Sequence, residues 1–252
     1  MARQRHLNNA PAFEAVIDIK VKPSPDITLS KLQEVKSTIS AEYPIEQELV
    51  ESSLEIKLDA KSKSMETVSA DALAIGYRYD STDKMRIAQF RLNGFALSRL
   101  KPYSQWEDLR NEAHKLWNLY CSVLKPEMIT RVAVRYINRL ELPLPFKKGF
   151  EDYLTALPPI PKGLPQIFNS FLTRIIVPLE PSKATVAITQ AIEPAIVIPG
   201  RVVPVLLDID VFKVGMFDID GIEAWDAIDS FRGFKNDAFF ASITEEMATL
   251  CD

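Results

Sequence analysis

Two segments alternate apolar and polar residues with the period of a β-strand, and this pattern points to a fold built on a sheet with one buried face. In residues 13–21, every second side chain from Phe13 to Val21 is apolar. Residues 130–142 repeat the alternation, with Val132 and Val134 on one side and charged residues on the other. Neighbouring side chains of a strand point to opposite faces, so each segment predicts a strand whose apolar face packs against other elements.

A helix and three more strands are predicted after the first strand. Thr28 or Ser30 can cap the helix, and Pro44 ends it. Strands are predicted at residues 49–58, 73–79 and 86–92, with a polar loop of lysine and serine between the first two. We expect these strands to form an antiparallel meander.

The strongest helical pattern in the chain begins at Ser104, where Glu107 stands three residues later as in a capping box. Its apolar positions are Trp106, Leu109, Ala113, Leu116, Trp117 and Tyr120. Because they fall on one stripe, the helix is expected to cover a sheet. Aromatic residues on the neighbouring strands can stack bases or pack a core, and the shared stripe favours the core.

A similar order of elements recurs in the second half. It comprises the strand at residues 130–142, a short helix near 150–157, strands near 168–179, 184–192 and 203–212, and helical spacing from Ile222 onward with a break at Gly233. The fold class is therefore predicted as α+β, with two similar β-α-β-β-β-α units and antiparallel sheets covered by helices. We place the units at residues 1–126 and 127–252, either packed side by side or fused through one continuous sheet.

Charge and cysteine content narrow the functional classes. A net charge of −4 and a pI near 5.4 argue against a bulk attraction to nucleic acid or to an anionic membrane. Cys121 and Cys251 are far apart in the sequence and indicate neither a disulfide framework nor a zinc site. The first residues lack the apolar core of a signal peptide and no apolar run is long enough to span a membrane, so we expect a cytoplasmic protein without membrane contact.

Three segments resemble a known family: APAFEAVIDIKV at the start, RLNGFALSRLKPYSQWEDL in the middle, and RVAVRYINRLELP at residues 131–143. Together they are similar to a family of sporadically distributed bacterial proteins of about this length whose function is uncharacterised. The resemblance implies a bacterial origin and an accessory gene, and a patchy distribution suggests a role in conflict such as phage defence. It supplies no catalytic residues.

Arginines are the main candidates for a binding site. Arg131, Arg135 and Arg139 are predicted to share one face of their strand, and a row of guanidinium groups can clamp phosphate or carboxylate. The alternative is structural pairing with Asp208 and Asp210, which share a face of a later strand. Three further arginines in the basic part of the first half extend the anion or nucleic-acid candidate set: Arg78, Arg86 and Arg91.

Metal and catalytic patterns are weaker, and we predict neither a metal nor a cofactor. The acidic string that includes Asp218 and Asp220 does not fit a calcium loop, and Asp220 is better placed as a helix cap. The order Asp26, Glu55, Lys57 resembles a nuclease site, but the last two also fit the polar side of an alternating strand. A His114–Cys121 pair would lie about 10 Å apart along a helix, and His6 is expected in a mobile tail.

The function predicted from the sequence is a non-enzymatic binding protein that acts with a protein partner or as a homo-oligomer. Phe239 and Phe240, near the end of the last helical segment, are candidates for the partner interface, as is the proline-interrupted stretch 195–212. The alternative is a nucleic-acid or nucleotide-binding module that uses the arginine-bearing sheet face. An enzyme with an unfamiliar site ranks third.

Overall fold

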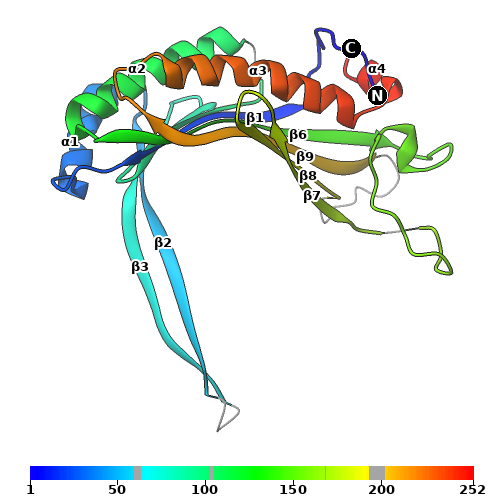
Figure 1. Ribbon diagram of the computed structural model, residues 1–252, viewed down its shortest axis with the longest axis horizontal. Coiled ribbons are helices and arrows are strands. Elements are labelled where there is room, and N and C mark those ends of the chain that lie inside the picture. The colour runs from blue at the N-terminus through cyan, green and yellow to red at the C-terminus, as the bar shows by residue number, and fades with distance from the viewer. Residues whose placement is uncertain (60–63, 103–104, 168, 193–201) are drawn as a thin grey trace.

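A single antiparallel sheet of nine strands organises the protein (Figure 1). The structure is a computed structural model that describes residues 1–59, 64–102, 105–167, 169–192 and 202–252, and for residues 52–71 it describes no side chains. The strands are β1 (Ala12–Lys22), β2 (Ile45–Asp59), β3 (Ser64–Asp80), β4 (Arg86–Arg91), β5 (Gly94–Leu100), β6 (Met128–Pro143), β7 (Leu172–Leu179), β8 (Ala184–Ile192) and β9 (Val202–Phe217). Their order across the sheet is β2-β3-β4-β5-β1-β6-β9-β8-β7.

The predicted α+β class is confirmed, and the two halves of the chain share the sheet. In each half the first strand pairs with the last, β1 with β5 and β6 with β9, and the remaining strands follow outward. The halves meet where β1 runs antiparallel to β6, with Ile17 opposite Val134 and Ile19 opposite Val132. Since one sheet runs through both halves, the division into two units at residues 126 and 127, in the loop between α2 and β6, stays a prediction.

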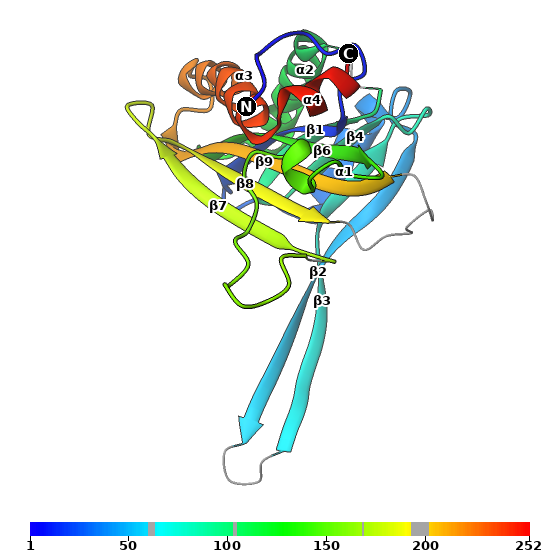
Figure 2. The same cartoon turned by 90° about the vertical axis from the view of Figure 1, so that its right-hand side faces the viewer.

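Helices lie on one face of the sheet, and we call the other side the uncovered face (Figures 1 and 2). The helices are α1 (Leu29–Ile39), α2 (Trp106–Leu124), α3 (Glu223–Ser242) and α4 (Glu245–Leu250). Thr28 caps α1 through its side chain, which accepts a hydrogen bond from the Lys31 amide. α2 packs over β5 and β1, whereas α3 packs over β6, β9 and β8.

The predicted stripe of α2 forms the centre of the core in the first half. All six of its predicted members are buried, and Trp117 stacks on Tyr120 with ring centroids 5.3 Å apart. Phe90 and Phe95 of the strands contact Tyr120, each with a centroid distance of 6.4 Å. These aromatic side chains therefore pack the core, as the stripe predicts.

Several sequence-based boundaries are wrong for physical reasons. β5 escaped prediction because its first five residues are all buried and show no alternation. Gly233 does not break α3, because a glycine at an exposed helical position costs only about 1 kcal/mol, which tertiary packing easily offsets. Asp220 does not cap that helix, whose N-cap is Ile222, and the helix expected at 150–157 is a single 3-10 turn, Phe150–Asp152. The predicted cap Ser104 lies outside the described residues.

Strands β2 and β3 extend far beyond the rest of the sheet as a two-stranded ribbon (Figures 1 and 2). They pair from Ile45 opposite Asp80 to Asp59 opposite Ser64, yet within the described chain β3 pairs with β4 only over Gly76–Asp80. We call residues 50–59 and 64–74 the arm. Neither arm strand was predicted at full length, because lysines and serines at its outer end are typical of a loop.

Gly76 anchors the arm where β3 meets β4. A Cβ atom at this position would lie 2.2 Å from the carbonyl oxygen of Phe90 and 2.7 Å from the Cα atom of Arg91. Both contacts are with backbone, which cannot move aside without separating the two strands. The close approach of β3 to β4 therefore requires glycine at this position.

We predict opposite effects for alanine at two glycines. Gly76→Ala should lower the free energy of unfolding by about 2 kcal/mol or more, since the methyl group meets the β4 backbone. Gly233→Ala, at an exposed helical position with nothing within 4 Å of the new Cβ, should raise it by about 0.5–1 kcal/mol. Urea unfolding of both variants tests this, and an unchanged midpoint for Gly76→Ala would contradict it.

Candidate functional site

The uncovered face carries a network of ion pairs that crosses the join between the two halves. On β6, Arg135 binds Asp208 of β9 through two parallel hydrogen bonds of 2.8 and 2.7 Å. Arg131 donates to Asp210 of the same strand at 2.8 Å. The carboxylate partner expected for Arg135 under the structural alternative is thus confirmed.

Asp18 of β1 extends this network into the first half of the chain. It accepts a hydrogen bond of 3.2 Å from Arg131 and another from Arg91 of β4. Strand β5 separates β4 from β1, and the residue opposite Arg91 on β5 is Gly94. Because glycine has no side chain, nothing at that position blocks the arginine from reaching Asp18.

Partial burial shifts the pKa values of charged groups in and beside this network. Burial raises the pKa of Asp210 above its ordinary value, although Arg131 and Arg135 act in the opposite direction. Burial also lowers the pKa of Lys20, with Arg91 contributing to the decrease. Among the described residues, Asp210 Oδ1 and Arg91 Nε are buried without a hydrogen-bond partner. Ion pairs removed from water in this way stabilise little by themselves, but breaking one is costly.

The six candidate arginines do not form one common cationic surface. Arg78 binds Asp80 on its own strand with a shortest contact of 2.6 Å. Arg86 binds Glu112 of α2 at 2.7 Å, and its guanidinium lies over the Tyr43 ring. Arg139 is also engaged within the chain. Arg91 and Arg131 share the carboxylate of Asp18, and Arg135 lies beside them through its pair with Asp208.

The predicted partner interface at Phe239 and Phe240 needs correction. Each phenylalanine is only 6 % exposed, and the two rings pack edge to face with centroids 5.2 Å apart. Both belong to the core because α3 turns this side toward the body of the protein. Of the stretch 195–212, residues 202–212 form part of β9, an interior strand paired on both sides, and the remainder lies outside the described residues.

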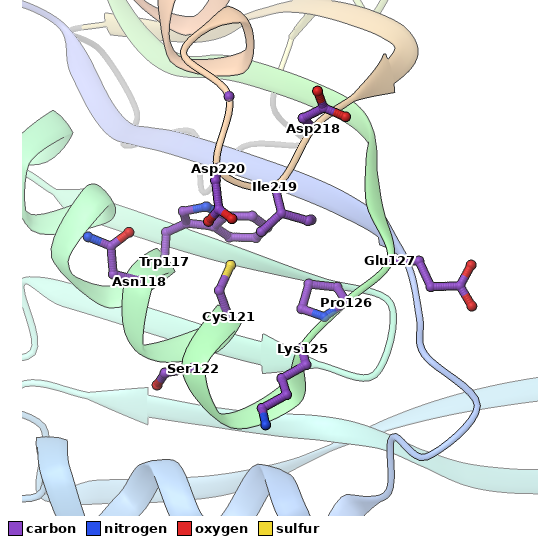
Figure 3. A pocket seen from close by; sticks show the side chains of 11 residues that line it. Trp117, Asn118, Cys121, Ser122, Lys125, Pro126, Glu127, Asp218, Ile219 and Asp220 are labelled. Atoms are coloured by element: carbon purple, nitrogen blue, oxygen red, sulfur yellow. The ribbon is translucent and has the colours of Figure 1, made fainter.

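An open hollow of about 960 Å³ lies between the end of α2 and the loop that joins β9 to α3 (Figure 3). Trp117, Cys121 and Ile219 contribute apolar surface, and Asp218 and Asp220 contribute carboxylates. Burial, with a smaller effect from Asp220, raises the pKa of Cys121 to about 12. The thiol therefore stays protonated at neutral pH and is a poor nucleophile.

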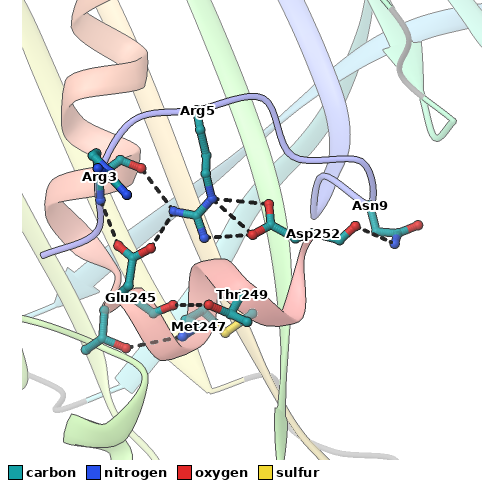
Figure 4. A network of polar contacts seen from close by, with 8 residues as sticks. Arg3, Arg5, Asn9, Glu245, Met247, Thr249 and Asp252 are labelled. Atoms are coloured by element: carbon teal, nitrogen blue, oxygen red, sulfur yellow. Dashed lines mark hydrogen bonds and ion pairs between the residues drawn. The ribbon is translucent and has the colours of Figure 1, made fainter.

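The chain termini are fastened together on α4 (Figure 4). Arg5 binds Asp252 and Glu245, with shortest contacts of 2.8 and 2.6 Å, and the Ala2 amide donates to the carbonyl oxygens of Phe240 and Ile243. His6 thus lies in a docked segment and not in a mobile tail. The other histidine, His114, packs edge to face on Trp225 with a centroid distance of 4.8 Å.

No protein-family model and no curated protein matches this chain. A proposal for its function therefore rests on the geometry. The resemblance to a sporadic bacterial family stays a prediction. Within the described residues, no group of three or more His, Cys, Asp or Glu side chains is arranged to hold a metal ion. In the same part of the chain, no helix combines the length and apolar character needed to cross a bilayer.

Two features of the surface do not follow from the sequence. One is the projection of the arm beyond the sheet. The other is the exposure of β7, an outer strand that was predicted near residues 168–179 but whose apolar side chains face solvent. The exposed fractions on β7 are 72 % for Leu172, 52 % for Ile175, 60 % for Ile176 and 40 % for Val177. A continuous apolar run is ambiguous between a buried strand and an exposed edge, because only the tertiary structure shows what covers it.

Arg131→Ala should destabilise the protein more than Arg135→Ala. The Arg131 side chain is 25 % exposed and serves two carboxylates, whereas Arg135 is 48 % exposed and serves one. We expect losses of about 2 kcal/mol and at most about 1 kcal/mol respectively. Urea unfolding at pH 7 measures both, and equal losses would contradict the ranking.

The loss in Arg131→Ala should also depend on pH. Removing the guanidinium raises the pKa of Asp210 further, and a carboxyl with a raised pKa in the folded state favours folding when protonated. That contribution is complete below the unfolded-state pKa and is lost as the pH rises through the folded-state pKa. The variant should therefore approach the parent near pH 4 and fall furthest below it near pH 7.

Proposed function

We propose that this chain is a non-enzymatic binding protein that holds a protein partner between the arm and the uncovered face of the sheet. The observation that carries the proposal is the arm. Over the described residues it is a two-stranded ribbon without a third strand, and an isolated two-stranded hairpin is at best marginally stable in water. A partner that packs on the ribbon would supply the missing support.

Exposed apolar side chains at the root of the arm support this proposal. Val50 is 55 % exposed on β2, and Leu73 is 68 % exposed on β3. Apolar side chains on a projecting ribbon are typical of surfaces that bind another protein. The ribbon leaves on the side of the sheet that no helix covers, so a partner on the arm also reaches the uncovered face (Figure 1).

The ion-pair network supports a protein partner over a nucleic acid. Asp18, Asp208 and Asp210 stand among the guanidinium groups of this face. Their carboxylates neutralise the arginines and would repel a phosphate backbone, whose binding depends on uncompensated cationic side chains. A mixed polar surface suits the selective recognition of a protein.

Shortening the arm tests the proposal. Glu51 pairs with Leu73, so replacing residues 52–72 with Asn-Gly closes a two-residue hairpin next to the body. The shortened chain should keep the thermal unfolding midpoint within a few degrees of the parent, because the removed residues lie beyond the rest of the sheet. It should lose the protein that co-purifies stoichiometrically with the tagged parent from the source cells, measured by quantitative mass spectrometry.

A matched control distinguishes binding at the arm from nonspecific binding to any exposed apolar side chain. Ile222 is 74 % exposed at the start of α3, on the side of the sheet that the helices cover, so Ile222→Ser removes a comparable apolar side chain away from the proposed surface and should keep the partner. Retention of the partner by the shortened chain would contradict the proposal. So would the absence of any stoichiometric partner on the parent.

A further inference from the structure

The two outer strands of the sheet differ in how they resist pairing with another chain. Backbone amides and carbonyls on the free side of an outer strand form a template for a further strand, and proteins commonly block such edges with charged side chains. β2 follows this rule in its described part, with Glu48 and Glu51 exposed. β7, with the sequence LTRIIVPL, has Arg174 as its single charged residue.

Both faces of β7 are largely exposed among the described residues. β7 pairs with β8 on one side, and α3 packs mainly over β6, β9 and β8. Leu172 and Ile176 point to one face and Ile175 and Val177 to the other, and all four are at least 40 % exposed. Proline at position 178 removes one amide, so most of the free edge keeps its hydrogen-bonding groups.

We propose that β7 pairs antiparallel with β7 of a second copy of this chain, so that the sheets of the two copies join across a two-fold axis. An antiparallel pair of identical strands is self-complementary and forms a closed dimer, whereas β7 joined to β2 of another copy would form an open chain of molecules. Pairing extends the backbone hydrogen bonding of both sheets. It also places apolar side chains of each copy beside those of the other on both faces.

The position of Arg174, the single charged residue on β7, also favours a second copy of this chain as the partner of the strand. If the two-fold axis lies anywhere from Ile175 to Val177, Arg174 stands opposite a residue between positions 176 and 180 of the other copy. It never stands opposite the second Arg174, so like charges do not meet. At one end of this range it faces Glu180, an opposite charge exposed just beyond the strand. This inference does not rest on the proposed function, because the arm lies at the other edge of the sheet.

Light scattering coupled to size exclusion, run on the full chain from about 1 to 100 μM, tests the proposal. The parent should elute with twice the monomer mass of 28.4 kDa at the upper end of this range. Ile175→Lys and Ile176→Lys, on opposite faces of β7, should each give a monomer at the same concentration. Leu73→Lys changes an apolar residue on β3 that is even more exposed, and should remain a dimer.

Three outcomes overturn the proposal: a parent that stays monomeric throughout, lysine variants that remain dimeric, or a Leu73→Lys variant that becomes monomeric. Circular dichroism confirms that each variant is folded. If a lysine variant unfolds, oxidation of three variants that each add one cysteine, Ile175→Cys, Ile176→Cys and Val177→Cys, provides the second measurement. A disulfide forms only where the two copies of the new cysteine lie opposite each other, so the variant whose cysteine lies at the two-fold axis should cross-link into covalent dimers. If none of the three cross-links while the native chain is dimeric, the interface lies elsewhere. Loss of the arm-bound partner leaves this dimer intact, so the two proposals fail separately.

Discussion

The antiparallel pairing of β1 with β6 is the centre from which the other strands of the sheet follow outward on both sides. Ile17, Ile19, Val132 and Val134 are fully buried on the helix side of this pair, under α2 from the first half and α3 from the second. On the opposite side, the same two strands bring Asp18 next to Arg131. The pair therefore joins the two halves through their apolar core and their charged network at once, and it fixes which strands become the outer edges.

The sequence predicts both strands of this central pair, though not their pairing, because each strand has one buried and one polar face. It predicts the stripe of α2 for the same reason, since one face of a helix also has a single environment. It fails where the environment is set by distant segments. β5 is buried on both sides, shows no alternation and was missed, whereas β7 was predicted as a strand without any sign that both of its faces are exposed. The Arg135–Asp208 pair was foreseeable from two matching strands, whereas the contact of Arg91 with Asp18 depends on the glycine between their strands.

The surfaces with the strongest case for recognition lie away from the join of the two halves. The central strands pair with a neighbouring strand on both sides, and their arginines already form ion pairs with carboxylates. The arm and β7, at opposite edges, leave backbone groups or apolar side chains without cover among the described residues. A rigid central sheet with unsatisfied edges suits a protein that positions other chains, since binding surfaces work best on a framework that does not itself rearrange.

Hydrogen exchange monitored by mass spectrometry tests the central claim, namely that the β1–β6 pair makes both halves one cooperative unit from which the arm stands apart. Amides of β1, β6 and β9 should exchange together, through a single global opening. Amides of residues 50–59 and 64–74 in the free protein should exchange about 1,000-fold faster or more. Separate opening of the two halves, with β1 and β5 exchanging at a different free energy from β6 and β9, would contradict the account.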